Sequence, residues 1–195
     1  MKTEGLTRAE RQAQTRIRLL EVARDMFLAD GYAATSLEKV AVEAGFSKGA
    51  VYSNFQGKEE LCLAVLDEIH AEKVEDIVAA FTQQPTIEEK LRTFVEWSRQ
   101  GLGDPRWTAL LVEFAASARS NEWVATELVK RQSEVTDAIA GLIEHVAAEA
   151  GFTQVDPRRT ATTLFALGMG LGAMSSLDPT TDVEVFASTM RALIR

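Results

Sequence analysis

The sequence has little of the material from which disulfide scaffolds, zinc modules and membrane proteins are made. It holds 1 cysteine, Cys62, and 2 histidines, too few for an intramolecular disulfide or a cysteine-rich metal site. No apolar run reaches the roughly 18 residues of a membrane span, and the first residues lack the apolar segment of a signal peptide. We therefore expect a cytoplasmic protein with no metal, no cofactor and no membrane partner.

The sequence motifs of common enzyme classes are missing as well. There is no glycine-rich dinucleotide turn, no phosphate-binding loop and no Gly-x-Ser-x-Gly elbow. Neighbouring acids such as Glu88 and Glu89 are typical of a solvated helix start. This inventory predicts that the chain is not an enzyme.

Charge is distributed unevenly along the chain. There are 21 Lys and Arg against 29 Asp and Glu, which gives a net charge of −8. Residues 1–60 hold nine of each sign, so the whole negative excess falls in residues 61–195. The first 18 residues carry five cations and two anions. We infer a front part that can approach phosphate groups and an acidic remainder that does not.

Hydrophobic periodicity predicts helices throughout, and the scarcity of proline, with 4 residues in all, permits long ones. No segment alternates apolar and polar residues as a strand does, so the expected fold class is all-α with about nine helices. The expected helices cover residues 15–29, a short stretch between Ser36 and Gly45, and residues 48–55, 58–81, 87–100, 106–118, 122–150, 157–176 and 182–194.

Two short helices near the N-terminus are joined by a tight turn. Ser36 is a good N-cap for the first, and Gly45 ends it. Ser47 can cap the second, so the connection is Gly45-Phe46-Ser47. A glycine-containing turn of this length indicates a helix-turn-helix, whose second helix lies in the major groove of DNA.

The residues around this turn resemble the signature of the tetracycline-repressor (TetR) family. The similarity covers residues 16–62 and is carried by GYAATSL at 31–37, VAVEAGFSKGAVYSNF at 40–55 and KEEL at 58–61. The resemblance implies a three-helix DNA-binding domain followed by a larger helical bundle for ligand binding and dimerisation. We place the first domain at residues 1–60, with 1–14 as a flexible basic arm that is solvated or touches DNA, and the second at 61–195.

The second helix of the motif and its surroundings are the predicted DNA-contacting surface. Lys48 suits a guanine edge or a phosphate, Gly49 lets the backbone come close, and Tyr52 can stack on a sugar. Simpler roles stay open, with the serines as helix caps and Lys58 as a solvated charge. The predicted contacts are Thr35, Ser36, Ser47, Lys48, Gly49, Tyr52, Ser53, Asn54 and Lys58, while Val51 and Phe55 anchor the helix from behind.

The family resemblance places the dimer contact in the last two long helices. Residues 164–174 are apolar nearly all round and hold small residues at Gly168 and Gly172, which allows close helix approach. The predicted interface residues are Gly168, Leu171, Gly172, Phe186 and Met190. The alternative is a core helix of a single chain.

An aromatic set in the middle of the chain is the predicted ligand pocket. All three tryptophans fall within residues 97–123, and pockets between bundle helices are lined by such residues with few polar groups. The predicted lining residues are Phe94, Trp97, Trp107, Glu113, Phe114 and Trp123. The alternative is that this aromatic stripe is ordinary core.

The predicted function is that of a dimeric repressor. Its partners would be double-stranded operator DNA, a second copy of the chain and a small hydrophobic effector that releases it from a palindromic site. A regulator of the same fold that is ligand-activated or ligand-independent is the alternative. A helical protein-interaction adaptor is the other class of function that the fold could serve.

Overall fold

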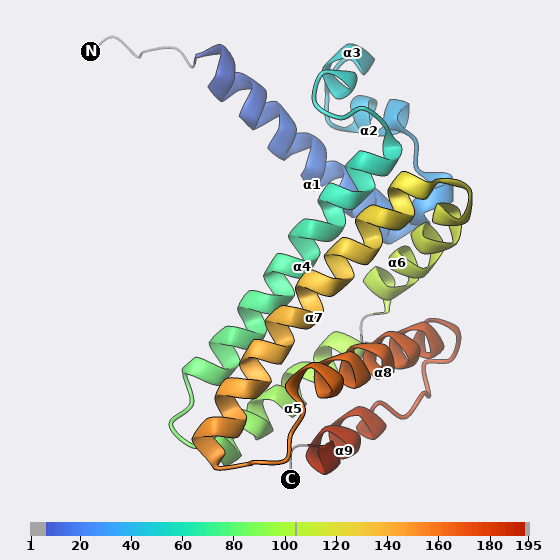
Figure 1. The fold of residues 1–195 in the computed structure, drawn as a ribbon. Coiled ribbons are helices and arrows are strands. Elements are labelled where there is room, and N and C mark those ends of the chain that lie inside the picture. Colours follow the sequence, from blue (N-terminus) through green and yellow to red (C-terminus); the bar gives the residue numbers. More distant parts are fainter. Residues whose placement is uncertain (1–6, 104, 194–195) are drawn as a thin grey trace. The chain divides into compact units, whose positions relative to one another are not determined.

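The computed structural model describes residues 7–103 and 105–193, apart from the side chains of residues 80, 81 and 101–103 (Figure 1). Over these residues every regular element is helical, which confirms the predicted all-α fold. The helices are α1 Arg8–Ala34, α2 Leu37–Glu43, α3 Lys48–Tyr52, α4 Lys58–Thr82, α5 Ile87–Gly103, α6 Arg106–Ser117, the short 3-10 helix η1 Ala118–Ser120, α7 Glu122–Ala150, α8 Pro157–Leu177 and α9 Glu184–Leu193.

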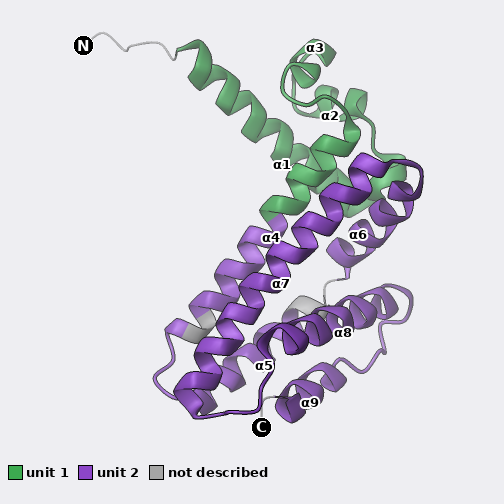
Figure 2. Ribbon diagram, viewed as in Figure 1, with its two compact units in different colours: residues 1–68 green, residues 69–195 purple. Residues whose placement is uncertain are grey.

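The chain forms two compact units, residues 1–68 and residues 69–195 (Figure 2). The division falls inside α4, eight residues beyond the expected boundary after residue 60. Helix α4 therefore contributes its first part to one unit and the rest to the other.

The first helix begins earlier than expected. Thr7 caps it, since Glu10 N donates to Thr7 Oγ1 at 3.2 Å and Thr7 N donates to Glu10 Oε2 at 2.6 Å. These bonds hold the pKa of Glu10 below its usual value. Residues 8–14, expected to be a flexible arm, are thus helical, and residues 1–6 of that arm lie outside the described residues.

Glycines make the two breaks that shape the first unit. Gly31 has φ +84°, and it interrupts the helical backbone of α1 where the sequence predicts a stop. Gly45 has φ +75° and turns the chain after α2, where Phe46 N donates to Ala41 O at 2.8 Å. Both backbones lie in a region that costs glycine little. The core beneath is apolar and includes Leu19, Ala23, Phe27, Val40, Val51, Phe55 and Leu61.

In the second unit, α8 is packed against α5, α6, α7 and α9. A Cβ at Gly172 would lie 2.6 Å from Thr108 Oγ1, so glycine is what allows α8 to approach α6. An ion pair between Arg99 and Glu184 joins α5 to α9. It lowers the pKa of the carboxyl and raises that of the guanidinium.

Among the described helices, α8 is long and apolar enough to cross a membrane by length and composition alone. A single helix of this kind is weak support for a membrane span, because core helices of soluble proteins meet the same criteria. In this chain Leu164 and Leu171 of α8 are buried in the core of the second unit.

Gly141 within α7 and Gly151 at its C-cap allow the effect of backbone conformation to be measured apart from steric crowding. A Cβ at either Gly141 or Gly151 would meet nothing within 4 Å, but Gly151 has φ +72° and Gly141 is helical. We expect Gly141→Ala to raise the free energy of unfolding by about 0.5–1 kcal/mol and Gly151→Ala to lower it by about 1 kcal/mol. Urea unfolding followed by circular dichroism, at one protein concentration, measures both. Equal shifts would contradict the assigned left-handed cap.

Candidate functional site

Helix α3 presents a polar face to solvent and an apolar face to its own unit. Ser47 caps the helix by accepting from Ala50 N at 3.2 Å. Lys48 and Gly49 of the first turn are exposed, and the side chain of Tyr52 follows one turn later with 48% of its surface exposed. Val51, on the other side, is fully buried. The helix thus offers its N-terminal turn outward, as a base-reading helix requires.

The exposed lysine of this face has an anionic partner. Lys48 Nζ lies 2.5 Å from Glu38 Oε1 of α2 and 5.7 Å from the centroid of the Tyr52 ring. The hydrogen bond lowers the pKa of Glu38 and raises that of Lys48, so both stay charged near neutrality. The sequence analysis did not predict this pair, because the contact joins two different helices.

Several of the predicted DNA contacts also complete helix ends. Ser36 accepts from Lys39 N at 3.3 Å, which confirms its role as a cap. The side chains of Ser53 and Asn54 donate to Ala50 O at 2.9 Å and 2.8 Å. Ser53 is exposed and Asn54 is half-buried. Their contacts with DNA stay predictions.

Thr35 is the exception among the predicted contacts. Its side chain is 1% exposed, and Oγ1 donates to Gly31 O at 2.9 Å. The hydroxyl therefore satisfies a carbonyl at the break in α1 and faces the interior. We remove it from the predicted phosphate contacts.

Two cations bind carbonyls at the C-terminal ends of helices in this unit. Lys58 Nζ donates to Ala33 O at 3.3 Å and lies 4.1 Å from the centroid of the Tyr32 ring. Arg16 donates to Asn54 O at 2.7 Å, and its guanidinium carbon lies 4.1 Å from the centroid of the Phe55 ring. Cations suit the negative ends of helix dipoles. The sequence did not reveal this role for Arg16, while Lys58 keeps its predicted phosphate contact.

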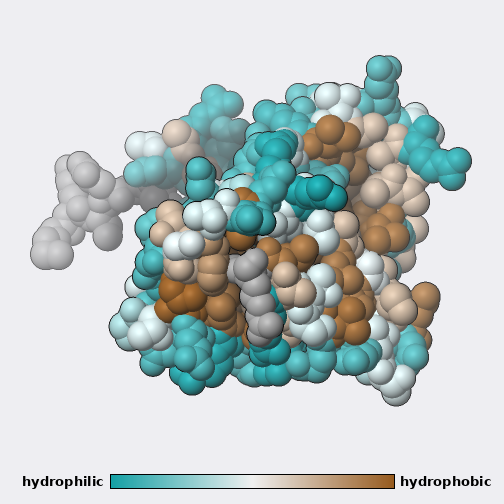
Figure 3. Space-filling view, turned by 60° about the horizontal axis from the view of Figure 1, so that its bottom comes forward, coloured by the Kyte–Doolittle hydropathy of each residue, from teal (hydrophilic) through white to brown (hydrophobic). Residues whose placement is uncertain are grey.

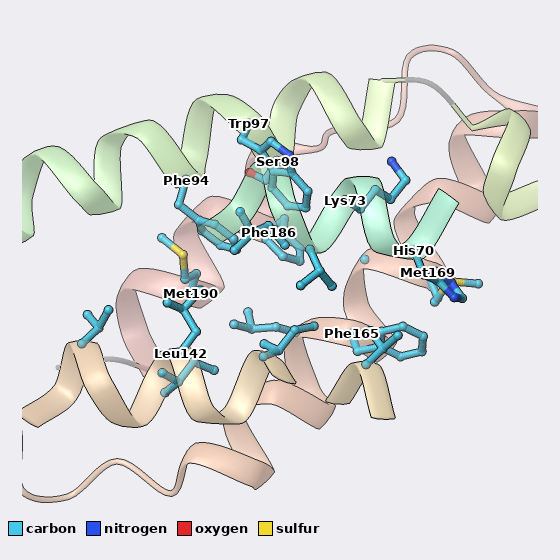
Figure 4. Close-up of a pocket in the computed structure, with 18 of the residues that line it drawn as sticks. His70, Lys73, Phe94, Trp97, Ser98, Leu142, Phe165, Met169, Phe186 and Met190 are labelled. Atoms are coloured by element: carbon cyan, nitrogen blue, oxygen red, sulfur yellow. The ribbon is translucent and has the colours of Figure 1, made fainter. Parts of the chain in front are cut away.

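The second unit contains a cavity of about 130 Å³ whose wall is almost wholly apolar (Figure 4). Its lining residues come from α4 to α9: His70, Lys73, Val74, Ile77, Phe94, Trp97, Ser98, Trp107, Val135, Ile139, Leu142, Ile143, Val146, Leu164, Phe165, Gly168, Met169, Phe186 and Met190. An apolar and aromatic lining with few polar groups is typical of a site for a small apolar molecule.

Only some of the residues predicted to form the ligand pocket line the cavity. Phe94, Trp97 and Trp107 line it. Glu113, Phe114 and Trp123 do not line it: Phe114 is fully buried, and Trp123 is 50% exposed. The residues of α4 were missed, although His70, Lys73, Val74 and Ile77 recur at the spacing of one helix face.

The predicted dimer residues are largely buried within one chain, and their contact with a second copy stays a prediction. Gly168, Phe186 and Met190 line the cavity, Leu171 is 7% exposed, and Gly172 meets Thr108. This packing matches the alternative of a core helix and leaves these residues little surface for a second copy. The exposed large hydrophobic residues among the described parts of the last two helices are Met174, Leu177 and Val185. Figure 3 views the end of the molecule that carries α5, α8 and α9, and it shows hydrophobic residues gathered between hydrophilic ones.

Comparison with known proteins gives consistent results for both units. Residues 19–65 match the family model of bacterial regulatory proteins of the tetR family. Residues 87–195 match the C-terminal model of the BetI-type transcriptional repressor. The HTH-type transcriptional regulator UidR of Escherichia coli K12 is 24% identical over 186 residues, which cover 92% of this chain and 91% of UidR.

Two solved structures share the fold over nearly the whole length. GusR of Salmonella enterica has a TM-score of 0.67 and 25% identity and covers 97% of this chain and 96% of its own. A TetR transcription regulator from Haloarcula marismortui has a TM-score of 0.75 and 20% identity and covers 93% and 97%. The two family models together span most of the chain, which therefore belongs to the TetR family of DNA-binding transcriptional regulators.

Proposed function

We propose that the chain is a homodimeric repressor that binds a palindromic operator through α3 and leaves it when a small apolar molecule enters the cavity of the second unit. The observation that carries the proposal is the outward face of α3, with Lys48, Gly49 and Tyr52 exposed in front and Val51 buried behind. The match to the BetI-type repressor model supports the assignment as a repressor. Such a protein works in the cytoplasm, where its operator is.

In this proposal each copy places one α3 in a major groove. Lys48 reaches a base edge or a phosphate, and Tyr52 and Ser53 contact the sugar–phosphate backbone. The helix starts at Ser36 and Ser47 present backbone N–H groups that can bind phosphates. Two copies are needed because half-sites of such operators lie about 34–36 Å apart. Exposed Met174 and Leu177 of α8 support a surface for the second copy.

Helix α4 is the proposed connection between ligand and DNA. It begins at Lys58, beside the end of α1, and carries the cavity residues His70 and Lys73 further along. Twelve residues separate Lys58 from His70, or about 18 Å at the rise of an α-helix. A ligand that prefers one position of α4 therefore biases the placement of α3. Couplings of this kind are typically about 1–3 kcal/mol, or about 5–150-fold in affinity.

The first test measures binding to the promoter DNA of the chain's own gene and to scrambled DNA. Fluorescence anisotropy at two salt concentrations gives both affinities. We expect a preference of about 10³-fold or more for the promoter at physiological salt. Lys48→Ala and Tyr52→Ala should each weaken promoter binding about tenfold or more. Lys130→Ala, which removes an exposed lysine of α7, is the matched control and should bind normally. Normal binding by both α3 variants would exclude this face as the reading surface.

Gly49 tests whether DNA approaches the backbone of α3. A Cβ there would meet only Ser47 Oγ, at 3.8 Å, and the backbone has no positive φ. Gly49→Ala should therefore keep or raise the free energy of unfolding, by up to about 1 kcal/mol. It should nevertheless weaken promoter binding, because the methyl group would stand between the helix start and the phosphate. Gly141→Ala is the control with the same added methyl group in α7. Wild-type promoter affinity in Gly49→Ala would show that the backbone stays clear of DNA.

Glu38 tests the ion pair on the recognition face. Glu38→Gln removes the carboxylate beside Lys48 Nζ, so the lysine charge becomes fully available to phosphates. We expect binding to scrambled DNA to rise about three- to tenfold at low salt, with a steeper salt dependence by about one ion. Glu43→Gln, which removes an exposed acid at the end of α2, is the control for net charge. An equal rise in both variants would mean that the ion pair has no specific effect.

A further inference from the structure

We propose, building on the proposed function of the cavity, that its ligand is an amphiphile with an apolar chain and a carboxylate head, and that Trp107 and Lys73 hold the head. The inference concerns the class of ligand, and it rests on the distribution of polar groups around the cavity. It excludes two other classes that an aromatic pocket could take, polyols and quaternary ammonium compounds.

The body of the cavity suits a hydrocarbon chain. Phe94, Leu142, Phe186 and Met190 surround it, and Phe94 lies 5.5 Å from Trp97 between ring centroids. The hydroxyl of Ser98, which also lies in the wall, already donates to Val95 O at 2.7 Å. A sugar or another polyol would lose its water here with few groups to replace it, which is unfavourable.

Three polar side chains of the lining, His70 and Lys73 of α4 and Trp107 of α6, lie close to one another. The indole N–H of Trp107 is buried, and among the described residues no acceptor lies within hydrogen-bond distance of it. Lys73 Nζ lies 4.8 Å from the centroid of the Trp107 ring, and the His70 ring meets that ring edge-on at 6.1 Å. Figure 4 shows Leu142 and Met190 at one side of the cavity and His70 and Lys73 toward the other. The cavity therefore has an apolar end and an end rich in donors.

A carboxylate has two acceptor oxygens for the donors at this end, and its charge is opposite to that of Lys73. Its two oxygens can accept from the Trp107 N–H and from the Lys73 ammonium together, and a buried donor without an acceptor gains most from such a bond. The lining residues, all of them in the described part of the chain, include no aspartate or glutamate. A quaternary ammonium at this end would meet the like charge of Lys73, whose ammonium already lies over the face of the Trp107 ring.

Isothermal titration of the full-length dimer with three octyl compounds tests the sign of the head group. Octanoate, octanol and octyltrimethylammonium share the chain and differ in the head. We expect octanoate to bind about tenfold or more tightly than either of the others, and hexanoate, decanoate and dodecanoate locate the preferred length. Equal binding of the three heads, tighter binding of the ammonium compound, or no binding of any carboxylate would each overturn the inference.

Two pairs of variants assign the head contacts. Lys73→Gln should weaken octanoate about five- to tenfold and leave octanol within about twofold, because only the charged partner is lost. Trp107→Phe keeps a ring but removes the N–H, so it should weaken octanoate and octanol alike. Lys130→Gln and Trp123→Phe make the same changes at exposed positions of α7 and should leave binding unchanged. Unaltered octanoate binding in Lys73→Gln and Trp107→Phe would place the head elsewhere and overturn the assignment.

The same titration separates this inference from the proposed function. If octanoate binds tightly but leaves promoter affinity unchanged, the inferred ligand class stands. The proposed control of DNA binding by the cavity is then wrong. If a compound of another class releases the promoter and no carboxylate binds, the proposed control of DNA binding stands. The inferred ligand class is then wrong.

Discussion

A helix of five residues does not hold its own shape in water, because the first turn fixes several residues for one hydrogen bond. The orientation of α3 therefore depends on the burial of Val51 and Phe55 against α1 and α2. Arg16 reinforces this packing by covering the Phe55 ring and binding Asn54 O. The burial that holds the helix does not involve Lys48 and Tyr52, whose side chains stay exposed to solvent.

The parts of this unit that depend on neighbours in sequence were predictable. The caps at Ser36 and Ser47 and the turn at Gly45 follow from residue type and spacing, and the structure has each of them. The capping box of Thr7 and Glu10 is a local signal of the same kind. The apolar stripe that predicts this helix begins only after residue 15, so the predicted start lies seven residues beyond the observed one at Arg8.

Contacts between segments that are distant in sequence could not be predicted from residue type and spacing. Phe94 and Phe114 are the same residue type on consecutive helices, yet only Phe94 lines the cavity. The apolar character of α8 was taken as a sign of a dimer surface, although Ala161, Leu164 and Leu171 of this helix pack in the core of a single chain. Glycine spacing in that helix correctly indicated close approach, but the partner of Gly172 is Thr108 of the same chain. Composition indicates that a surface must be covered, and tertiary structure decides by what.

The distribution of tryptophans has a practical consequence. Trp97 and Trp107 stand in the wall of the cavity, and Trp123 is half exposed at the start of α7. The intrinsic emission of the chain therefore divides into a part that senses the cavity and a part that senses bulk water. A molecule that fills the cavity shields the first two indoles from a dissolved quencher and leaves the third open to it. The chain thus carries its own optical reporter of occupancy, with an internal reference.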